Sequence, residues 1–109
     1  INALYSKLLD GAGVRLPPTA GENDVAHLYV IRTPERDRLR TVLAERGIAT
    51  DVHYPIPDHR QECDRGTASS DCVLPVTEAC CGEVLSLPCF PEMDDEEVGR
   101  VAECVRQAL

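Results

Sequence analysis

Apolar residues follow two different periods along this chain, and the change of period separates helices from strands. A spacing of three and four positions predicts helices, whereas short β-rich apolar runs predict strands. We expect helices over residues 1–9, 34–46, 76–83 and 94–109, and strands over residues 26–31, 48–54 and 84–87. The run 26–31 is continuously apolar, so we expect this strand to be buried on both faces, with His27 as a hydrogen-bonded core residue.

Local signals place the ends of two helices. Thr33 is expected to cap the second helix with Pro34 at its first position, since proline is pre-organised for that place. Gly47 supplies the left-handed residue that ends this helix. Asp94 and Glu97 have the spacing of a capping box, so the last helix is expected to open there. Its core-facing stripe is predicted to be Val98, Val101, Ala102, Val105 and Leu109.

The order of these elements predicts an α+β fold in a single domain over residues 1–109. The strands at 26–31 and 48–54 flank a helix and are expected to form a βαβ unit, with a third strand at 84–87. The expected architecture is therefore a small three-stranded sheet packed with helices. Residues 59–70 are polar and irregular, so we expect a mobile loop there.

Charge and composition exclude several classes of function. Nineteen acidic and eleven basic side chains give a formal net charge of -8, which repels a nucleic-acid backbone. No apolar run reaches the roughly 20 residues of a membrane-spanning helix, and no signal segment opens the chain. The six cysteines lack C-x-x-C spacing, so we expect reduced thiols and no metal. These features predict a cytoplasmic protein without a nucleic-acid or membrane partner.

The chain carries no complete catalytic apparatus. Lys7, its only lysine, lies on the short opening helix, where a solvated position is expected rather than the buried pocket of a Schiff-base lysine. No serine stands in a nucleophile motif, and Glu78 is expected to compensate a helix dipole. The first residue is Ile1 rather than methionine, so we expect that the chain was cut from a longer polypeptide.

The most informative chemistry lies in the loop His53–His59, which directly follows a predicted strand. The loop holds two of the three histidines, a tyrosine and two prolines. Proline fixes φ, so the loop is stiff and presents polar rings at the end of a sheet. His53, Tyr54 and His59 form either a ligand-facing cluster or a rigid strand exit without a ligand, and their spacing leaves both interpretations open.

Several segments taken together resemble one known family. They are His27-Leu28-Tyr29-Val30-Ile31, Arg36-Asp37 with Leu39 and Leu43, Gly47-Ile48 with Thr50, His53-Tyr54-Pro55 with Pro57 and His59, Leu74-Pro75 with Glu78, and Val84-Leu85-Ser86-Leu87-Pro88 with Pro91. From about residue 1 to 109, the chain is similar to the C-terminal part of the DegT/DnrJ/EryC1/StrS sugar aminotransferases. The resemblance implies the small C-terminal domain of a fold-type I pyridoxal-phosphate enzyme.

The resemblance also implies a function. Such enzymes move an amino group from glutamate or glutamine onto a keto sugar that is usually nucleotide-linked. Their large domain supplies the Schiff-base lysine and the cofactor contacts, so we expect no catalytic or cofactor-binding residue in this chain and no activity from the chain alone. The implied partners are that large domain of the same protein, a sugar-nucleotide substrate and a second copy in a homodimer.

Four residues match the family's loop that approaches the substrate. The resemblance therefore implies that His53, Tyr54 and His59 bind substrate, with Arg60 as a further contact to phosphate or carboxylate. His27, Ser86 and Pro88 match positions that we interpret as structural.

Two alternatives remain open. The first is a detached or fused copy of this domain that serves as an interaction or folding module without transamination. The second is an aminotransferase for a cyclitol or an aromatic precursor, since relatives of this family act on ketones that carry no nucleotide. The sequence upstream of Ile1 distinguishes the first alternative, and substrate profiling distinguishes the second.

Overall fold

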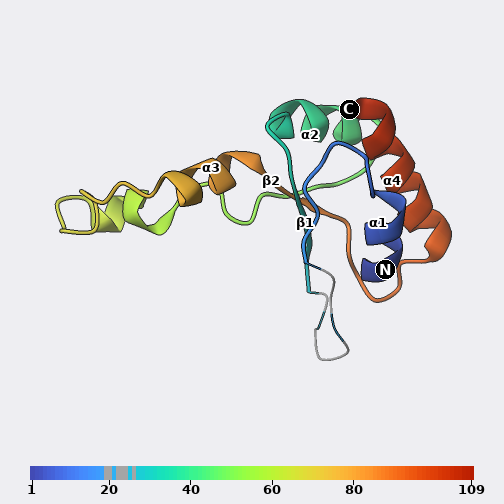
Figure 1. Cartoon of the computed structure of the whole chain (residues 1–109), viewed down its shortest axis with the longest axis horizontal. Helices are drawn as coiled ribbons and strands as arrows, with labels where there is room; N and C mark the ends of the chain where they lie inside the picture. The colour runs from blue at the N-terminus through green and yellow to red at the C-terminus, as the bar shows by residue number, and fades with distance from the viewer. Residues whose placement is uncertain (19–20, 22–24, 26) are drawn as a thin grey trace.

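The structure is a computed structural model that describes residues 1–18, 21, 25 and 27–109. Within these residues the elements are α1 (Asn2–Leu8), β1 (Tyr29–Arg32), α2 (Arg36–Glu45), the 3-10 helices η1 (Asp58–Arg60) and η2 (Glu62–Asp64), α3 (Pro75–Glu83), β2 (Val84–Leu87) and α4 (Asp95–Ala108) (Figure 1). Every predicted helix forms close to its expected ends, and the strand at 84–87 forms as predicted. In the described part of the chain, no helix has the length and apolarity needed to cross a membrane.

Among the residues that the structure describes, the sheet has two strands rather than the predicted three. β1 and β2 pair antiparallel along their whole length, and residues 48–54 form no strand but touch β2 through one isolated bridge between Asp51 and Ser86. Continued pairing in this register would place Ala49 opposite Pro88, which has no N–H to donate. The predicted βαβ unit is wrong as well, because its second strand does not form and residues 48–54 bridge to β2 rather than to β1.

The first strand is shorter than the apolar run that predicted it. β1 begins at Tyr29, and the predicted start at Ala26 lies outside the described residues. Tyr29 and Ile31 are buried, whereas the two residues that alternate with them are only half-buried. The prediction of burial on both faces is therefore wrong. His27 precedes the strand and is exposed, so it is not a core histidine.

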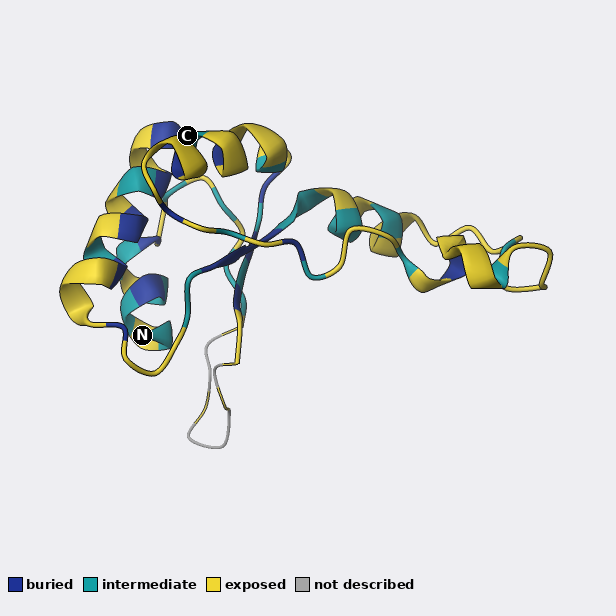
Figure 2. Ribbon diagram, turned by 180° about the vertical axis from the view of Figure 1, so that it is seen from behind, coloured by how far each residue is buried: buried dark blue, intermediate teal, exposed yellow. Residues whose placement is uncertain are grey.

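The hydrophobic core lies between the sheet and α1, α2 and α4, which gather on one side of the strands (Figures 1 and 2). At its centre the rings of Tyr5 and Tyr29 stack with their centroids 4.8 Å apart. The Tyr5 hydroxyl donates to the carbonyl oxygen of Pro88 at 2.9 Å, and burial raises the pKa of Tyr5 well above its ordinary value. Leu109, predicted to face the core, is instead 41% exposed because it follows the last turn of α4. The core residues are Tyr5, Leu9, Tyr29, Ile31, Leu39, Leu43, Ile48, Val52, Leu85, Leu87, Met93, Val98, Val101, Ala102, Val105 and Ala108.

The ends of α2 and α4 follow the local signals in the sequence. Asp94 and Glu97 form the predicted capping box at the start of α4, and Gly47 has a φ of 73° just after α2, a conformation that glycine adopts without strain. The Thr33 hydroxyl accepts a backbone hydrogen bond at 3.2 Å. Regular α-helix nevertheless begins only at Arg36, later than the prediction.

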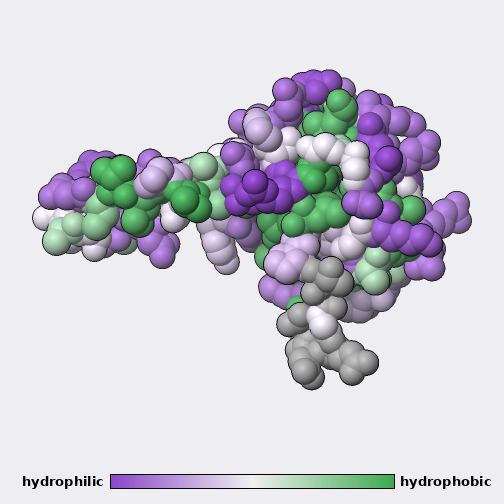
Figure 3. Space-filling model, in the orientation of Figure 1, coloured by the Kyte–Doolittle hydropathy of each residue, from purple (hydrophilic) through white to green (hydrophobic). Residues whose placement is uncertain are grey.

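Residues 54–82 form an arm that projects from this body (Figure 1). The arm contains η1, η2 and all but the last residue of α3, and no residue of α3 is buried (Figure 2). The radius of gyration is 15.5 Å, compared with about 13 Å for a compact domain of this length. The predicted mobile loop at 59–70 is part of this arm and includes η2. Apolar surface is visible along the arm in Figure 3, and its exposed large apolar side chains are Tyr54, Ile56, Val73, Leu74 and Val76.

Candidate functional site

His53 lies at the base of the arm and is held on two sides. Its Nδ1 is 2.9 Å from the hydroxyl oxygen of Ser86, and its Nε2 is 3.7 Å from Oδ2 of Asp51. The Tyr54 ring meets it edge-on, with centroids 5.6 Å apart and ring planes at 85°. Tyr54 itself is 73% exposed, so its phenol is available to a ligand.

His59 is the one buried residue of the arm, all of which is described, and it is 5% exposed. Its Nε2 lies 2.9 Å from Oε1 of Glu78 on α3, and the same oxygen accepts a hydrogen bond from Nη2 of Arg60 at 3.0 Å. Arg60 also donates to the carbonyl oxygen of Ser70 at 3.3 Å. Polar contacts around Glu78 therefore join η1, the following loop and α3.

The predicted substrate-binding residues do not line one common cavity. A cavity of about 550 Å³ runs along the arm and includes both Tyr54 and His59 in its wall. His53 lines another cavity of about 270 Å³ at the edge of β2. Arg60 lines neither of these two. The wall of the arm cavity consists of Tyr54, Ile56, Pro57, Asp58, His59, Asp64, Ser69, Cys72, Leu74, Thr77 and Cys81.

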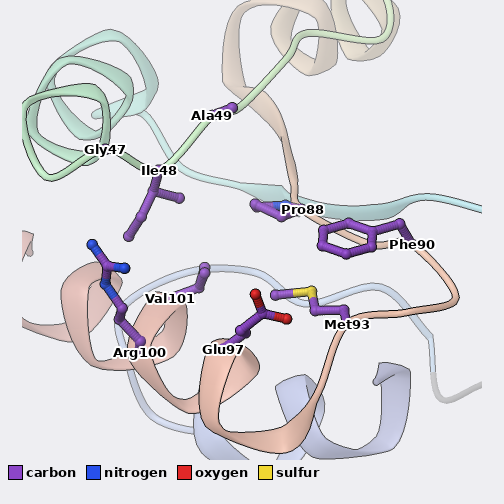
Figure 4. A pocket seen from close by; sticks show the side chains of 9 residues that line it. All are labelled: Gly47, Ile48, Ala49, Pro88, Phe90, Met93, Glu97, Arg100 and Val101. Carbon is purple, nitrogen blue, oxygen red and sulfur yellow. The ribbon is translucent and has the colours of Figure 1, made fainter.

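A third cavity, of about 230 Å³, lies between the turn after α2 and the start of α4 (Figure 4). Ile48 and Met93 contribute apolar surface to it. Its charged side chains already have partners: Glu97 closes the capping box, and Arg100 donates to the carbonyl oxygen of Arg46 at 2.9 Å. This cavity contains none of the predicted substrate-binding residues, and its charges serve the local fold.

Glu78 is the site residue that sequence reasoning missed. It does lie in the first turn of α3, as a residue that compensates the dipole would, but its carboxylate also accepts hydrogen bonds from both His59 and Arg60. These bonds, first that of His59 and then that of Arg60, lower the pKa of Glu78 below its ordinary value. The partners lie far apart in an irregular segment, so no periodic pattern connects them. The signals in the sequence were an acidic helix start after a His-Arg pair and the place of Glu78 beside Leu74-Pro75 in the family resemblance.

The order of the arm is expected to depend on pH through Glu78. Because the pKa of Glu78 is lowered in the folded arm, its stabilising contribution is present above the ordinary value of 4.5 and is lost as the pH falls through the lowered value. Amide hydrogen exchange of residues 54–82, corrected for intrinsic rates from neutral to acidic pH, measures this loss. A Glu78→Gln variant is the control, because it cannot titrate. An acid-dependent loss of the same size in that variant would contradict the prediction.

Comparison with known proteins gives the family of the chain. A model described as the DegT/DnrJ/EryC1/StrS aminotransferase family matches residues 1–106. The chain belongs to this family. The resemblance recognised in the sequence is thus confirmed over nearly the whole length of the chain.

Two relatives in the family show how much of a member the chain represents. It is 39% identical to UDP-N-acetyl-3-dehydro-alpha-D-glucosamine 3-aminotransferase of Acidithiobacillus ferrooxidans, across 96% of this chain and 28% of that protein. It is 40% identical to dTDP-3-amino-3,4,6-trideoxy-alpha-D-glucose transaminase of Streptomyces venezuelae, across 97% of this chain and 29% of that protein. The chain therefore spans less than a third of the length of these relatives and matches their C-terminal part.

Two solved structures have the same fold over this chain. The S. venezuelae protein DesV, solved in complex with a ketimine intermediate, superposes with a TM-score of 0.88 at 40% identity, covering 97% of this chain and 29% of that one. NtdA from Bacillus subtilis, solved with bound cofactor PMP, gives a TM-score of 0.77 at 29% identity, covering 97% and 25%. The α+β arrangement of the present chain is that of aminotransferases in this family.

The residues present do not fit covalent attachment of the pyridoxal cofactor on which the family depends. A Schiff-base lysine needs a desolvated pocket that lowers its pKa. Lys7, the only lysine in the sequence, is exposed on α1 and lines none of the three cavities above. Lys7 therefore offers no position for covalent attachment of that cofactor.

Metal ligation has no assembled site in the part of the chain that the structure describes. No group of three or more His, Cys, Asp or Glu side chains there is arranged to hold an ion. The six cysteines are not in disulfides. Cys72 and Cys81 lie in the wall of the arm cavity, and the Cys72 thiol donates to the carbonyl oxygen of Ala68 at 3.7 Å.

Proposed function

We propose that residues 1–109 form one domain, the small C-terminal domain of a pyridoxal-phosphate-dependent sugar aminotransferase. The enzyme moves an amino group from glutamate or glutamine onto a nucleotide-linked keto sugar. The observation that carries this proposal is the family match across residues 1–106. Two relatives at 39% and 40% identity, whose names describe a UDP-linked and a dTDP-linked amino sugar, support the substrate class.

In this proposal the cofactor and the catalytic lysine belong to a large domain outside residues 1–109. The exposed position of Lys7 supports this assignment, as does the greater length of the relatives. The arm supports it independently, since it exposes Ile56, Val73 and Val76 to solvent at 50%, 75% and 74%. Exposed apolar patches of this kind mark surfaces that another surface covers. We propose that the large domain covers these side chains. We also propose that the whole enzyme is a homodimer.

Within the arm and its base, the four predicted residues take two different roles. His53 and Tyr54 contact the substrate, because the Tyr54 phenol is exposed and the His53 ring lines an open cavity. His59 is buried against Glu78, and Arg60 already pairs with the same carboxylate. These two residues therefore support the substrate loop by ordering the arm, and Arg60, with 47% of its side chain exposed, retains surface for a phosphate.

The test is an assay of amino transfer by the longer polypeptide that carries this chain. With glutamate as donor and UDP- and dTDP-linked keto sugars as acceptors, we expect an amino-sugar product detectable by mass spectrometry. The His53→Ala variant is expected to lower kcat/KM about tenfold, because it removes one hydrogen bond to the substrate. His27→Ala, an exposed histidine outside the site, is the matched control and is expected to retain activity.

Two results would overturn the proposal. One is turnover of glutamate by residues 1–109 alone after addition of pyridoxal phosphate, because the chain would then hold the cofactor itself. The other is a longer polypeptide that aminates cyclitols or aromatic precursors but none of the nucleotide-linked keto sugars.

A further inference from the structure

We propose that Ser86 and Asp51 are positioning residues that fix the neutral imidazole of His53 with its proton on Nε2. The role of this tautomer towards substrate rests on the proposed function, because the contact of His53 with substrate belongs to that proposal. The arrangement itself stands on the contacts among these three side chains. Ser86 was interpreted as structural from the sequence, because its partners His53 and Asp51 come from a separate segment.

The backbone brings the serine and the acid opposite each other. The amide of Ser86 donates to the carbonyl oxygen of Asp51 at 2.8 Å, and the amide of Asp51 donates to the carbonyl oxygen of Ser86 at 3.2 Å. Residues paired in this way direct their side chains to the same face. Ser86 is 4% exposed, so its hydroxyl has little access to water and the His53 ring is the partner within reach.

The carboxylate of Asp51 is oriented by a bond of its own. Oδ1 accepts a hydrogen bond from the backbone N–H of Val52 at 2.7 Å, which leaves Oδ2 on the side of His53 Nε2, 3.7 Å away. An ionised carboxylate only accepts hydrogen bonds. It therefore favours a proton on the ring nitrogen that faces it, directly by its charge or through one bridging water.

With the proton on Nε2, the other ring nitrogen must accept. Nδ1 lies 2.9 Å from Ser86 Oγ, and a serine hydroxyl rotates to donate where an acceptor is present. The two contacts thus select the same tautomer: Ser86 donates to Nδ1, and Asp51 attracts the proton on Nε2. A tautomer is set by the hydrogen bond that the other ring nitrogen makes.

The consequence concerns what His53 presents to a ligand. The ring lines the cavity of about 270 Å³ together with Thr50 and Pro88. The fixed tautomer presents an N–H donor rather than a lone pair at Nε2. In the proposed enzyme His53 therefore donates a hydrogen bond to a hydroxyl or carbonyl oxygen of the sugar, and it does not act as a base through that nitrogen.

The test reads the tautomer directly and needs no transamination. In the chain labelled with ¹⁵N-histidine, long-range ¹H–¹⁵N correlation spectra at a pH where the ring is neutral report which nitrogen of His53 carries the proton. A His53→Gln variant assigns the signals. We expect the Nε2–H form in the unmodified chain and a shift of roughly fivefold in tautomer ratio towards Nδ1–H in Ser86→Ala, the effect of one lost hydrogen bond.

Matched variants separate this effect from a change in packing. Ser6 also bonds an aromatic residue, with its Oγ 3.1 Å from the Tyr29 hydroxyl, so Ser6→Ala is expected to leave His53 unchanged. Ser86→Thr keeps the hydroxyl and is expected to restore the Nε2–H form. Should Ser86→Ala fail to fold, Asp51→Asn, which removes the charge at an exposed position, is expected to shift the ratio in the same direction.

Several outcomes would overturn the inference. These are an Nδ1–H or evenly mixed ring in the unmodified chain, an unchanged ratio in a folded Ser86→Ala variant, or an unchanged ratio in Asp51→Asn. None depends on aminotransferase activity. A fixed Nε2–H tautomer combined with full activity of His53→Ala would leave the positioning intact and refute the substrate contact instead.

Discussion

Tyr29→Ala is expected to lower the free energy of unfolding by about 4 kcal/mol, the usual cost of emptying a buried aromatic site. Tyr29 is fully buried in β1 and stacks on Tyr5, and its hydroxyl lies 3.1 Å from Ser6 Oγ. The change removes contacts to the sheet and to α1 together. Domains of this size have a free energy of unfolding of only about 5–15 kcal/mol, so the variant loses a large fraction of its stability. Urea denaturation followed by circular dichroism measures the difference.

Tyr54→Ala is the matched control for this variant. Tyr54 is 73% exposed and makes one ring contact, with His53, so the same chemical change is expected to alter stability by no more than about 0.5 kcal/mol. Similar losses in the two variants would contradict the division of this chain into a packed body and an exposed arm.

His59→Ala is expected to release the arm while the body stays folded. His59 is the buried residue of residues 54–82, and its bond to Glu78 joins η1 to α3. α3 has no buried residue that could hold it in its place. Hydrogen bonds to charged groups are among the stronger contributions to stability. We therefore expect amide exchange in the arm to accelerate roughly tenfold or more, with exchange in α4 unchanged.

The control for His59→Ala is His27→Ala, which removes an exposed imidazole and is expected to leave exchange in the arm as it is. Hydrogen exchange with mass spectrometry resolves the two regions in one experiment. If the arm of His59→Ala keeps its protection, then the contact between Arg60 and Glu78 is sufficient, and the central role of His59 is refuted. If α4 exchanges faster as well, the arm and the body are not independent.

Predictions that depend on interactions within one helical turn were confirmed, whereas the prediction of strand pairing was wrong. Asp94 and Glu97 predicted the start of α4, and Gly47 predicted the end of α2, because a cap and a left-handed residue act within one turn. The helical stripe predicted the buried face of α4, with Leu109 as the exception. Residues 48–54 misled the prediction, since whether a segment pairs as a strand depends on the neighbour that it meets, and here β2 ends at Leu87, directly before Pro88.

The sequence by itself determined the helices, the family and the loop from His53 to His59, because periodicity, caps and a specific motif are properties of neighbouring residues. Only the tertiary structure decided that His53 meets Ser86 and Asp51, whereas His59 meets Glu78. Partners in these contacts come from segments that no period connects, and chain folding alone sets their distance. The same reason explains why a residue interpreted as dipole compensation, Glu78, holds together an arm that has no hydrophobic core.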